Sequence, residues 1–332
     1  MHFYDYVQAV DVTPDGRTAV FGDISTLENR LWFVDTVTNE ATMQTVVGDS
    51  LRAFATGISA NLAVSALHGA EPVDAAVWKA GDDWTSLPSP HAQGCDQDIS
   101  SAWDISADGT VVVGATWNEC AVEAARWVNG ALTRLEVLGE RLGGGTAPPD
   151  NRPSAVSDDG AITAGFAMTS LVDRAPVYWT ADGSGHFLPR SAEDAPGEVL
   201  AVNADGSVLA GVDSFDAVIW GGGTRIVIPR LDTLLPFDPV FANALTADGS
   251  IVFGAQGGGF GGPQDAYMWS LSRGLRKVAD VATDAGLTIP PDITLSNVSA
   301  VSADGTVIVG TASNVNTMAS SVFTLRLPAS AL

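Results

Sequence analysis

The chain has 332 residues, of which 46% are hydrophobic, and its 39 acidic against 16 basic side chains give a formal net charge of −23. Such a surface repels nucleic acid and anionic membranes, so nucleic-acid binding is excluded as a function class. The apolar content predicts a folded core, and no apolar run is long enough to span a bilayer, so we expect no membrane insertion.

One phrase recurs along the chain: an apolar residue, then Ser, Thr or Asn, then any residue followed by Asp-Gly. Its copies end at Gly16, Gly109, Gly160, Gly206, Gly249 and Gly305. The long interval between the first two contains a degenerate copy, Gly57 to Val64, which has lost its Gly. The sequence therefore predicts seven repeats, with turns near 16, 62, 109, 160, 206, 249 and 305. A period of this size indicates a propeller or a solenoid.

Each repeat contains several short strand patterns. The segments on either side of Asp-Gly, such as Thr110 to Gly114, read as a hairpin in which Gly supplies the positive φ of the turn. A third segment ends in an aromatic residue, and a fourth follows in most copies. The aromatic residues are Trp32, Trp78, Trp127, Trp179, Trp220, Trp269 and Phe323. Four strands per repeat predict one blade of a β-propeller.

We therefore predict an all-β fold, a seven-bladed β-propeller of four-stranded antiparallel blades forming a single domain over residues 1–332. The last repeat supplies only three clear strands, whereas an unassigned apolar segment, residues 2–6, precedes the first inner strand. We expect that N-terminal strand to pair with the last blade, because a closed ring removes unpaired edges. A helix is expected over 278–285, ended by Gly286.

The third repeat carries a resemblance to a known family. Its residues are Ile105-Ser106-Ala107-Asp108-Gly109, Glu123-Ala124-Ala125-Arg126-Trp127 and Leu135-Glu136-Val137-Leu138-Gly139. This pattern resembles the extracellular HAF-repeat proteins of bacteria, and Thr13-Pro14-Asp15-Gly16-Arg17 is similar to the repeats of TolB-like propellers. The resemblance implies a propeller and carries no general catalytic signature. The His of the family motif is replaced here by acids or small residues, so a role that rests on it does not transfer.

The compartment follows from the N-terminus and the resemblance together. The start, Met1 to Tyr4, lacks the basic segment and the apolar stretch of a signal peptide. Because the resemblance implies export, we expect an extracellular or periplasmic protein whose signal peptide is absent from this chain. We also expect a monomer. The acidity fits a saline habitat equally well.

The two cysteines favour an oxidising compartment. Cys95 precedes the inner strand of the third repeat and Cys120 follows its second strand. Antiparallel pairing about Asp108-Gly109 brings these two positions close together, which predicts a Cys95–Cys120 disulfide. The bond would close a loop of about 25 residues and contribute about 3 kcal/mol. The alternative is two free, buried thiols.

Acidic residues stand four positions before the aromatic residue in five repeats: Glu28, Asp74, Glu123, Asp216 and Asp265. Carboxylates spaced around a ring are candidate Ca²⁺ ligands. We favour a structural role in which each accepts hydrogen bonds from backbone N–H groups, because successive blades lie too far apart to share one ion. We therefore expect no metal or cofactor, with Ca²⁺ as the alternative, and we interpret the Asp of each Asp-Gly pair as a turn residue.

One repeat departs from the template. Trp103 stands where the other repeats have Val10, Thr56, Ser154, Leu200, Asn243 or Ser299, and Trp117 ends the next strand. Neighbouring loops supply His91, Asp96, Asp98, Asn118 and Glu119, and the second repeat supplies His68 and Glu71. Aromatic faces beside carboxylates and amides suit a sugar, which makes Trp103, Trp117, Asn118, Glu119, His91 and Glu71 the candidate ligand-binding residues. Alternatively, both Trp side chains only fill a gap between blades.

Two functions from different classes remain. We favour an exported, non-catalytic module that binds a glycan or a protein on the face bearing the inter-blade and second-to-third-strand loops. The alternative is a polysaccharide lyase or hydrolase that uses His68 or His91 with a carboxylate as acid and base. With only 4 His in the chain and no recognisable catalytic motif, the sequence favours binding.

Overall fold

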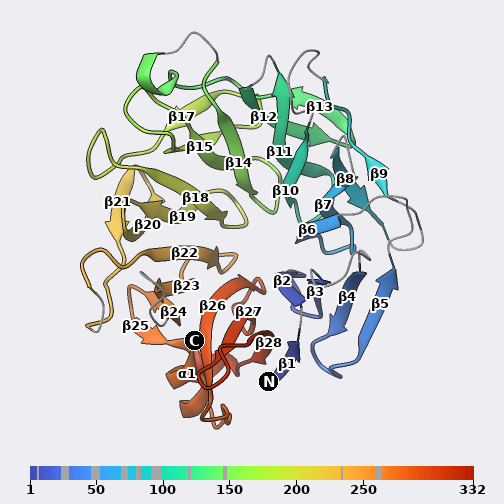
Figure 1. The fold of residues 1–332 in the computed structure, drawn as a ribbon, viewed down its shortest axis with the longest axis vertical. Coiled ribbons are helices and arrows are strands. Elements are labelled where there is room, and N and C mark those ends of the chain that lie inside the picture. Colours follow the sequence, from blue (N-terminus) through green and yellow to red (C-terminus); the bar gives the residue numbers. More distant parts are fainter. Residues whose placement is uncertain are drawn as a thin grey trace.

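Seven four-stranded antiparallel sheets are arranged in a ring, which confirms the predicted seven-bladed β-propeller (Figure 1). This description rests on a computed structural model. The structure describes residues 1–5, 7–23, 30–45, 53–68, 74–79, 82, 84–90, 99–118, 121–144, 148–232, 235–258 and 264–332. Each sheet is one blade, and its strands are given below from the centre of the ring outward.

Blade 1 contains β2 (Val7–Val12), β3 (Thr18–Asp23), β4 (Arg30–Asp35) and β5 (Ala41–Thr45), and blade 2 contains β6 (Ala53–Ile58), β7 (Val64–His68), β8 (Asp74–Trp78) and β9 (Thr85–Ser86). Blade 3 contains β10 (Ser101–Ile105), β11 (Val111–Asn118), β12 (Ala121–Val128) and β13 (Ala131–Arg134), and blade 4 contains β14 (Asn151–Val156), β15 (Thr163–Ala167), β16 (Ala175–Trp179) and β17 (Gly185–Phe187). Blade 5 contains β18 (Gly197–Val202), β19 (Val208–Asp213), β20 (Asp216–Gly221) and β21 (Thr224–Val227), and blade 6 contains β22 (Val240–Leu245), β23 (Val252–Gly257), β24 (Gln264–Ser270) and β25 (Gly274–Lys277). Blade 7 contains β26 (Ile293–Val301), β27 (Val307–Asn314), β28 (Ser320–Arg326) and β1 (His2–Asp5).

The two ends of the chain close the ring in blade 7. Strand β1 is antiparallel to β28, with His2 opposite Thr324 and Asp5 opposite Ser321. The N-terminal strand is therefore the outer strand of the last blade, as the sequence predicted, and Figure 1 shows it beside β28. This pairing covers an edge of β28 that would otherwise be open to another chain.

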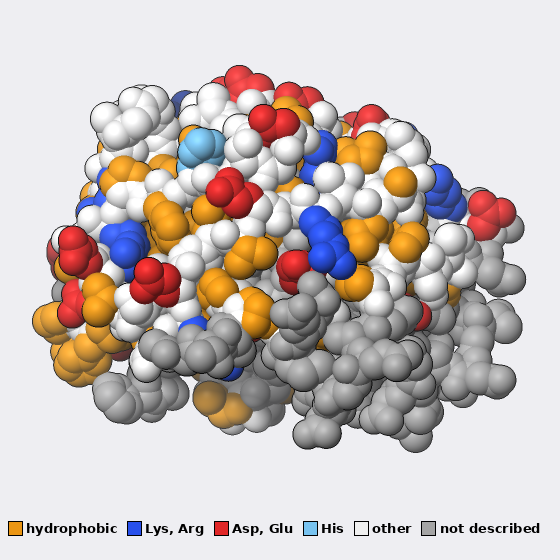
Figure 2. All heavy atoms as spheres, turned by 90° about the horizontal axis from the view of Figure 1, so that it is seen from above, with side chains coloured by type: hydrophobic (Ala, Val, Ile, Leu, Met, Phe, Trp, Pro, Cys, Tyr) orange, Lys and Arg blue, Asp and Glu red, His pale blue; other side chains and the backbone are white. Residues whose placement is uncertain are grey.

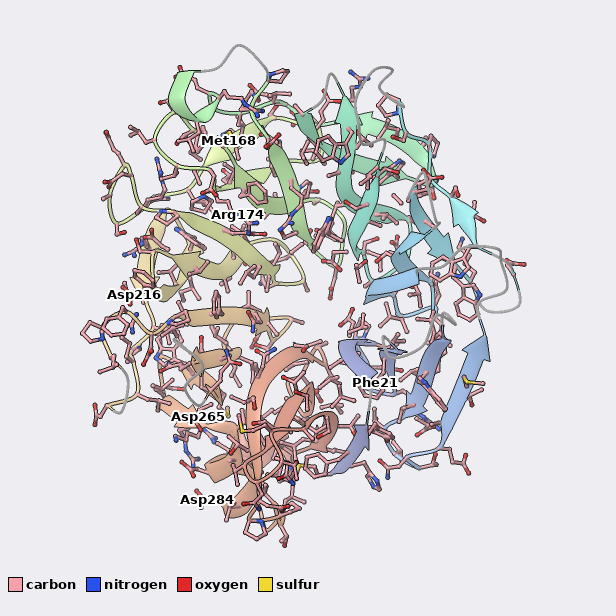
Figure 3. The ribbon with its side chains drawn as sticks, in the orientation of Figure 1. Phe21, Met168, Arg174, Asp216, Asp265 and Asp284 are labelled. Carbon is pink, nitrogen blue, oxygen red and sulfur yellow. The ribbon has the colours of Figure 1, made fainter. Side chains whose placement is uncertain are left out.

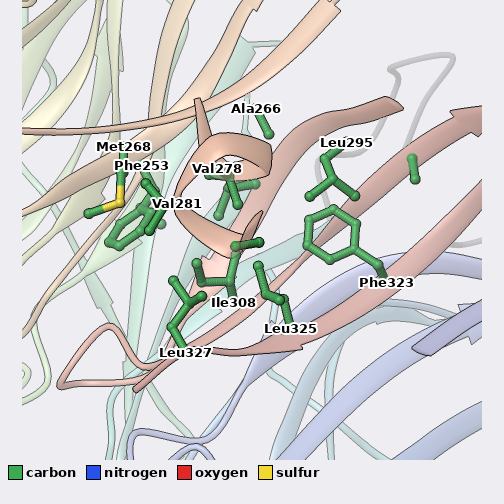
Figure 4. Packing of buried hydrophobic residues seen from close by; sticks show 14 residues of the cluster. Phe253, Ala266, Met268, Val278, Val281, Leu295, Ile308, Phe323, Leu325 and Leu327 are labelled. Carbon is green, nitrogen blue, oxygen red and sulfur yellow. The ribbon is translucent and has the colours of Figure 1, made fainter. Parts of the chain in front are cut away.

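The predicted helix is also present. Helix α1 (Val278–Asp284) follows β25, and Gly286 behind it has a φ of 81°. Its apolar side packs between blades 6 and 7, and Val281 lies with Ile308 and Leu325 in one buried cluster (Figure 4). Within the part of the chain that the structure describes, the remaining regular elements are two short 3₁₀ helices, Leu142–Gly144 and Ala329–Ala331. Among the described residues, no helix is long and apolar enough to cross a membrane.

The Asp of each Asp-Gly pair shapes its own turn. In blade 3, the Asp108 carboxylate accepts hydrogen bonds from the Thr110 N–H at 2.9 Å and the Ser106 hydroxyl at 2.8 Å. These hydrogen bonds, the Thr110 N–H first, lower the pKa of Asp108. The same two kinds of bond recur at Asp15, Asp159, Asp248 and Asp304, and at Asp205 with the Asn203 amide in place of the hydroxyl, which confirms their interpretation as turn residues. We call this side of the ring the turn face.

The turns also bond to one another around the turn face. Six backbone hydrogen bonds of 2.7–3.3 Å join successive blades: Ala60 to Ala107, Ala107 to Asp158, Asp159 to Ala204, Ala204 to Ala247, Ala247 to Ala303, and Ala303 to Pro14. The step from blade 1 to blade 2 has no equivalent, because Pro14 has no N–H to donate. At that step the carboxylate of Asp11 accepts a hydrogen bond from the Ile58 N–H at 2.9 Å.

The strand register corrects two of the predicted aromatic positions. Starting from the last residue of each inner strand and pairing outward, Trp78, Trp127, Trp179, Trp220 and Trp269 occupy one equivalent place. In blades 1 and 7 that place holds Val34 and Leu325, two residues beyond Trp32 and Phe323. Alignment on the nearest aromatic residue was therefore wrong in these two blades, and Glu28 does not belong to the series of acids.

Candidate functional site

A ring of bulged residues surrounds the central channel. In every inner strand the pairing with the second strand skips one residue at the same place, which is a β-bulge. The skipped residues are Val10, Thr56, Trp103, Ser154, Leu200, Asn243 and Ser299, and all of them line a channel of about 200 Å³. These are the repeat positions that the sequence compared with Trp103. The departure of blade 3 from the template therefore lies in the channel.

Two carboxyl groups stand next to the bulges. Asp104 accepts hydrogen bonds from its neighbour Ile105 N–H at 2.8 Å and from Val156 N–H of the next blade at 2.8 Å. Burial in the channel wall raises the pKa of Asp104 to about 8, and it raises that of Asp11, which bonds in the same way, to about 7. The two groups also repel each other when charged. Both carboxyls therefore titrate near neutral pH.

A stack of aromatic and guanidinium groups lies where the inner strands of blades 3 to 5 begin. The Arg152 guanidinium lies over the ring of Trp103 at 4.0 Å and near the ring of Phe166 at 4.9 Å. The Arg174 guanidinium lies over the same Phe166 ring, at 4.8 Å from its centre. This is the face of the ring that carries the inter-blade and second-to-third-strand connections, which we call the loop face. Figure 3 shows Arg174 between blades 4 and 5.

Glu198 joins the stack from blade 5. Its carboxylate accepts hydrogen bonds from Arg152 at 2.6 Å, Arg174 at 2.7 Å and the Ser154 hydroxyl at 2.5 Å. Its side chain is 5% exposed, and two cations with good geometry compensate for the loss of solvent around it. The two guanidiniums and one carboxylate leave the cluster with a net positive charge, and the Arg174 side chain is 49% exposed. Of this cluster, Trp103 and Ser154 line the channel, and the half-exposed Arg174 offers a charged donor on the loop face.

The repeat explains why these charges meet. Arg152 and Glu198 both stand two residues before the bulge, in adjacent blades, and equivalent positions of adjacent blades are neighbours around the ring. Ser101 has the same place in blade 3, where its hydroxyl accepts a hydrogen bond from the indole N–H of Trp103 at 2.9 Å. Sequence reasoning missed Arg152, Arg174 and Glu198. Comparing the repeats at this one position would have found two of them.

The structure places only part of the predicted site. Trp103 lines the channel, whereas Trp117, opposite Val122 in β11 and β12, is not among the residues that line it. His68 ends β7 opposite Asp74, and Asn118 ends β11, but their side chains lie outside the described part. His91, Glu71, Glu119, Asp96 and Asp98 lie outside the described residues, as do Cys95 and Cys120. The disulfide therefore stays a prediction.

Three of the repeated acids have cationic partners among the described residues, and the backbone role that we favoured stays a prediction. Asp216 pairs with Arg230 at 2.9 Å, Asp265 with Lys277 at 2.8 Å, and Glu123 with Arg134 at 3.8 Å. Asp74 begins β8, and Glu28 lies outside the described residues. Within the described ranges, no three His, Cys, Asp or Glu side chains are close enough together to hold a metal ion.

Comparisons with known proteins support the fold. No family model and no curated protein sequence matches the chain. The oligogalacturonate lyase of Vibrio parahaemolyticus is similar in structure at 14% identity, with a TM-score of 0.61 over 99% of this chain and 92% of that one. The Cps50 (Swd1) propeller domain of Myceliophthora thermophila is similar at 12% identity, with a TM-score of 0.56 over 97% and 98%.

TolB of Acinetobacter baumannii is similar at 12% identity, with a TM-score of 0.44 over 80% of this chain and 52% of that one. The likenesses to the lyase and to the Cps50 (Swd1) domain, at these identities, show the propeller fold alone. The resemblance of the repeats to HAF-repeat proteins stays a prediction.

Proposed function

We propose that this chain is an exported, non-catalytic binding propeller whose ligand is a glycan held on the loop face, at the mouth of the central channel. The observation that carries the proposal is the cluster of Trp103, Arg152, Arg174, Glu198 and Ser154. It is built from residues in which the repeats differ. Concave sites of this kind combine apolar surface with a few fixed polar groups.

The chemistry of the cluster suits a neutral sugar. The Arg174 guanidinium can donate to sugar hydroxyls, while Trp103 adds apolar surface in the channel wall. A polyanionic glycan is disfavoured because the molecule carries a net charge of −23. The half-exposed Arg174 is the donor most open to a ligand.

A screen of neutral glycans by thermal shift, followed by affinity measurement, tests the proposal. We expect Trp103→Ala and Arg174→Ala to weaken binding of a positive glycan at least about tenfold. Trp117→Ala is the matched control, since it removes an aromatic residue from the same blade outside the channel lining, and it should bind as the wild type does. Unchanged binding by both Trp103→Ala and Arg174→Ala would rule out the channel mouth as the site.

The proposed Cys95–Cys120 disulfide gives export a separate test, because such a bond persists in an oxidising compartment. Both cysteines lie outside the described residues. Mass spectrometry after alkylation, with and without reductant, counts the thiols. We expect Cys95 and Cys120 to resist alkylation until the protein is reduced. Two alkylated thiols in the untreated protein would contradict the disulfide.

A second candidate is an enzyme that acts on a polysaccharide. It is favoured by the two channel carboxyls, because Asp11 and Asp104, with pKa values of about 7 and 8, titrate where a general acid or base works best. His68 and His91 remain the histidines that could act with them. Cleavage of a bound glycan by the wild type but not by Asp104→Asn would favour this function over binding alone.

A further inference from the structure

An exposed aromatic residue stands at the tip of the tightest loop-face turn of blade 5. Strands β19 and β20 are joined by Ser214 and Phe215 alone, and Ser214 has a φ of 59°. Two-residue turns with positive φ normally carry Gly, Asn or Asp. Here the turn presents Phe215, which is 53% exposed. About half of the Phe215 side chain is therefore left out of the core.

The backbone around Phe215 is held firmly by Arg230. Its guanidinium donates to the carbonyl of Phe215 at 2.7 Å, to that of Leu235 at 3.2 Å and to that of Asp238 at 2.8 Å. It also pairs with the Asp216 carboxylate at 2.9 Å. One side chain therefore fixes two loops next to each other. Leu235, on the second of these loops, is 53% exposed.

Backbone hydrogen bonds link this turn to the neighbouring connections of blade 4. Ser214 N–H donates to the carbonyl of Pro196 at 2.6 Å, and Gly197 N–H donates to that of Arg174 at 2.9 Å. Three residues before Arg174, Leu171 is 55% exposed. We call Leu171, Phe215 and Leu235 the apolar ledge. Figure 2 shows hydrophobic side chains gathered at the left end of the disc, where blade 5 lies.

Acidic side chains surround the ledge. Asp173, Glu193, Asp194 and Asp232 are exposed on the same connections, and none of them has an ion pair within the described residues. On these connections, Arg174 is paired with Glu198 and Arg230 with Asp216, and Arg190 donates to the carbonyl of Ala195 at 3.3 Å. The ledge is therefore apolar at its centre and negative at its border.

This charge pattern selects the occupant. A second copy of the chain brings a further net charge of −23, and an anionic membrane is also repelled. We propose that the apolar ledge docks a segment of another polypeptide that carries both basic and apolar side chains. Exposed apolar groups on a rigid backbone lose little entropy on binding, and the acidic border steers a basic partner toward them. The inference goes beyond the glycan site and does not depend on it.

Two synthetic peptides test the charge requirement: an amphipathic helix of Leu and Lys, and the same pattern with Glu in place of Lys. We expect the Lys peptide to bind the full chain and the Glu peptide not to bind. Phe215→Ser with Leu235→Ser should weaken binding of the Lys peptide at least about tenfold. The matched control is Val37→Ser with Leu271→Ser, which alters two exposed apolar residues of the turn face and should leave binding unchanged.

Binding of the Lys peptide to Phe215→Ser/Leu235→Ser with wild-type affinity would overturn the proposal, since attraction would then be general. So would equal binding of the Glu peptide. Sedimentation of the wild type and flotation with anionic vesicles cover the other occupants: self-association or vesicle binding that is lost in the ledge variant assigns the ledge to a second copy or a membrane instead. An unchanged circular dichroism spectrum and melting temperature show that the variants fold.

Discussion

The two faces of the ring are built from the same repeat but differ in what the repeat preserves. On the turn face, the turns between the first and second strands all repeat one set of hydrogen bonds, and even the degenerate copy keeps it, with Asn61 accepting from Ser59 and Ala63. On the loop face, one repeat position holds Arg152 in blade 4 and Glu198 in blade 5. The difference separates the residues that build the ring from those that distinguish its blades.

The contrast also explains where function is expected. A turn that recurs in each blade serves the closure of the ring, because each blade is stable only against its neighbours. A position that changes from blade to blade cannot be explained by closure. The channel mouth and the apolar ledge both consist of such positions, and both lie on the loop face.

The largest expected effect comes from breaking the charge cluster of the loop face. Glu198→Ala leaves the mostly buried Arg152 without its carboxylate, so we expect a loss of about 3–5 kcal/mol in the free energy of unfolding, measured by urea denaturation. Glu198→Gln keeps an acceptor and should lose less. A loss below about 1 kcal/mol for Glu198→Ala would show that the cluster is not a structural unit.

A pH titration of stability comes next. Because the pKa values of Asp11 and Asp104 are raised in the folded chain, the folded chain binds more protons than the unfolded chain. The contribution of this protonation to the free energy of unfolding is therefore fully present below about pH 4. It is lost as the pH rises through 7 and 8. We expect the melting temperature to fall as the pH rises from about 4 to 8, at up to about 1.4 kcal/mol per pH unit for each carboxyl, and to level off above that. In Asp104→Asn the fall should be smaller, and an equal fall would contradict this origin.

A smaller effect is expected on the turn face. Gly206 has a φ of 71°, and an added Cβ would lie 2.3 Å from Ile162 of the preceding blade. Gly206→Ala should therefore destabilise the fold by about 1–2 kcal/mol in urea denaturation. Glycan binding at the channel mouth should not change. Gly222→Ala is the control for positive φ alone, because nothing lies within 4 Å of its added Cβ.

The smallest expected effect concerns one turn carboxylate. Asp108→Asn should destabilise the chain at neutral pH by less than about 1 kcal/mol, because the side chain is exposed and its bonds are screened. The lowered pKa of Asp108 means that its contribution is present above about pH 4 and is lost as the pH falls below that value. Wild type and variant should therefore converge in melting temperature at acid pH. A difference that persists at pH 2 would point to packing instead.

Particular residues show where sequence reasoning was sufficient and where it was not. The recurrence of Asp-Gly revealed the blades because a turn is a local structure whose residues are neighbours in the chain. The closing strand could be inferred because the last repeat lacked a strand that residues 2–6 could supply. Equivalence of Trp32 and Phe323 with the other aromatics failed, because strand register depends on pairing between strands and not on residue type.

The sequence by itself determined the number of blades, their strand order, the closing strand and the turn chemistry, because each follows from local propensity and from repetition. Only the tertiary structure decided which unrepeated residues meet. Arg152 and Glu198 are 46 positions apart in the chain and touch because adjacent blades bring equivalent positions together. Their contact and the raised pKa values of the channel carboxyls depend on how adjacent blades lie around the ring, which no local pattern encodes.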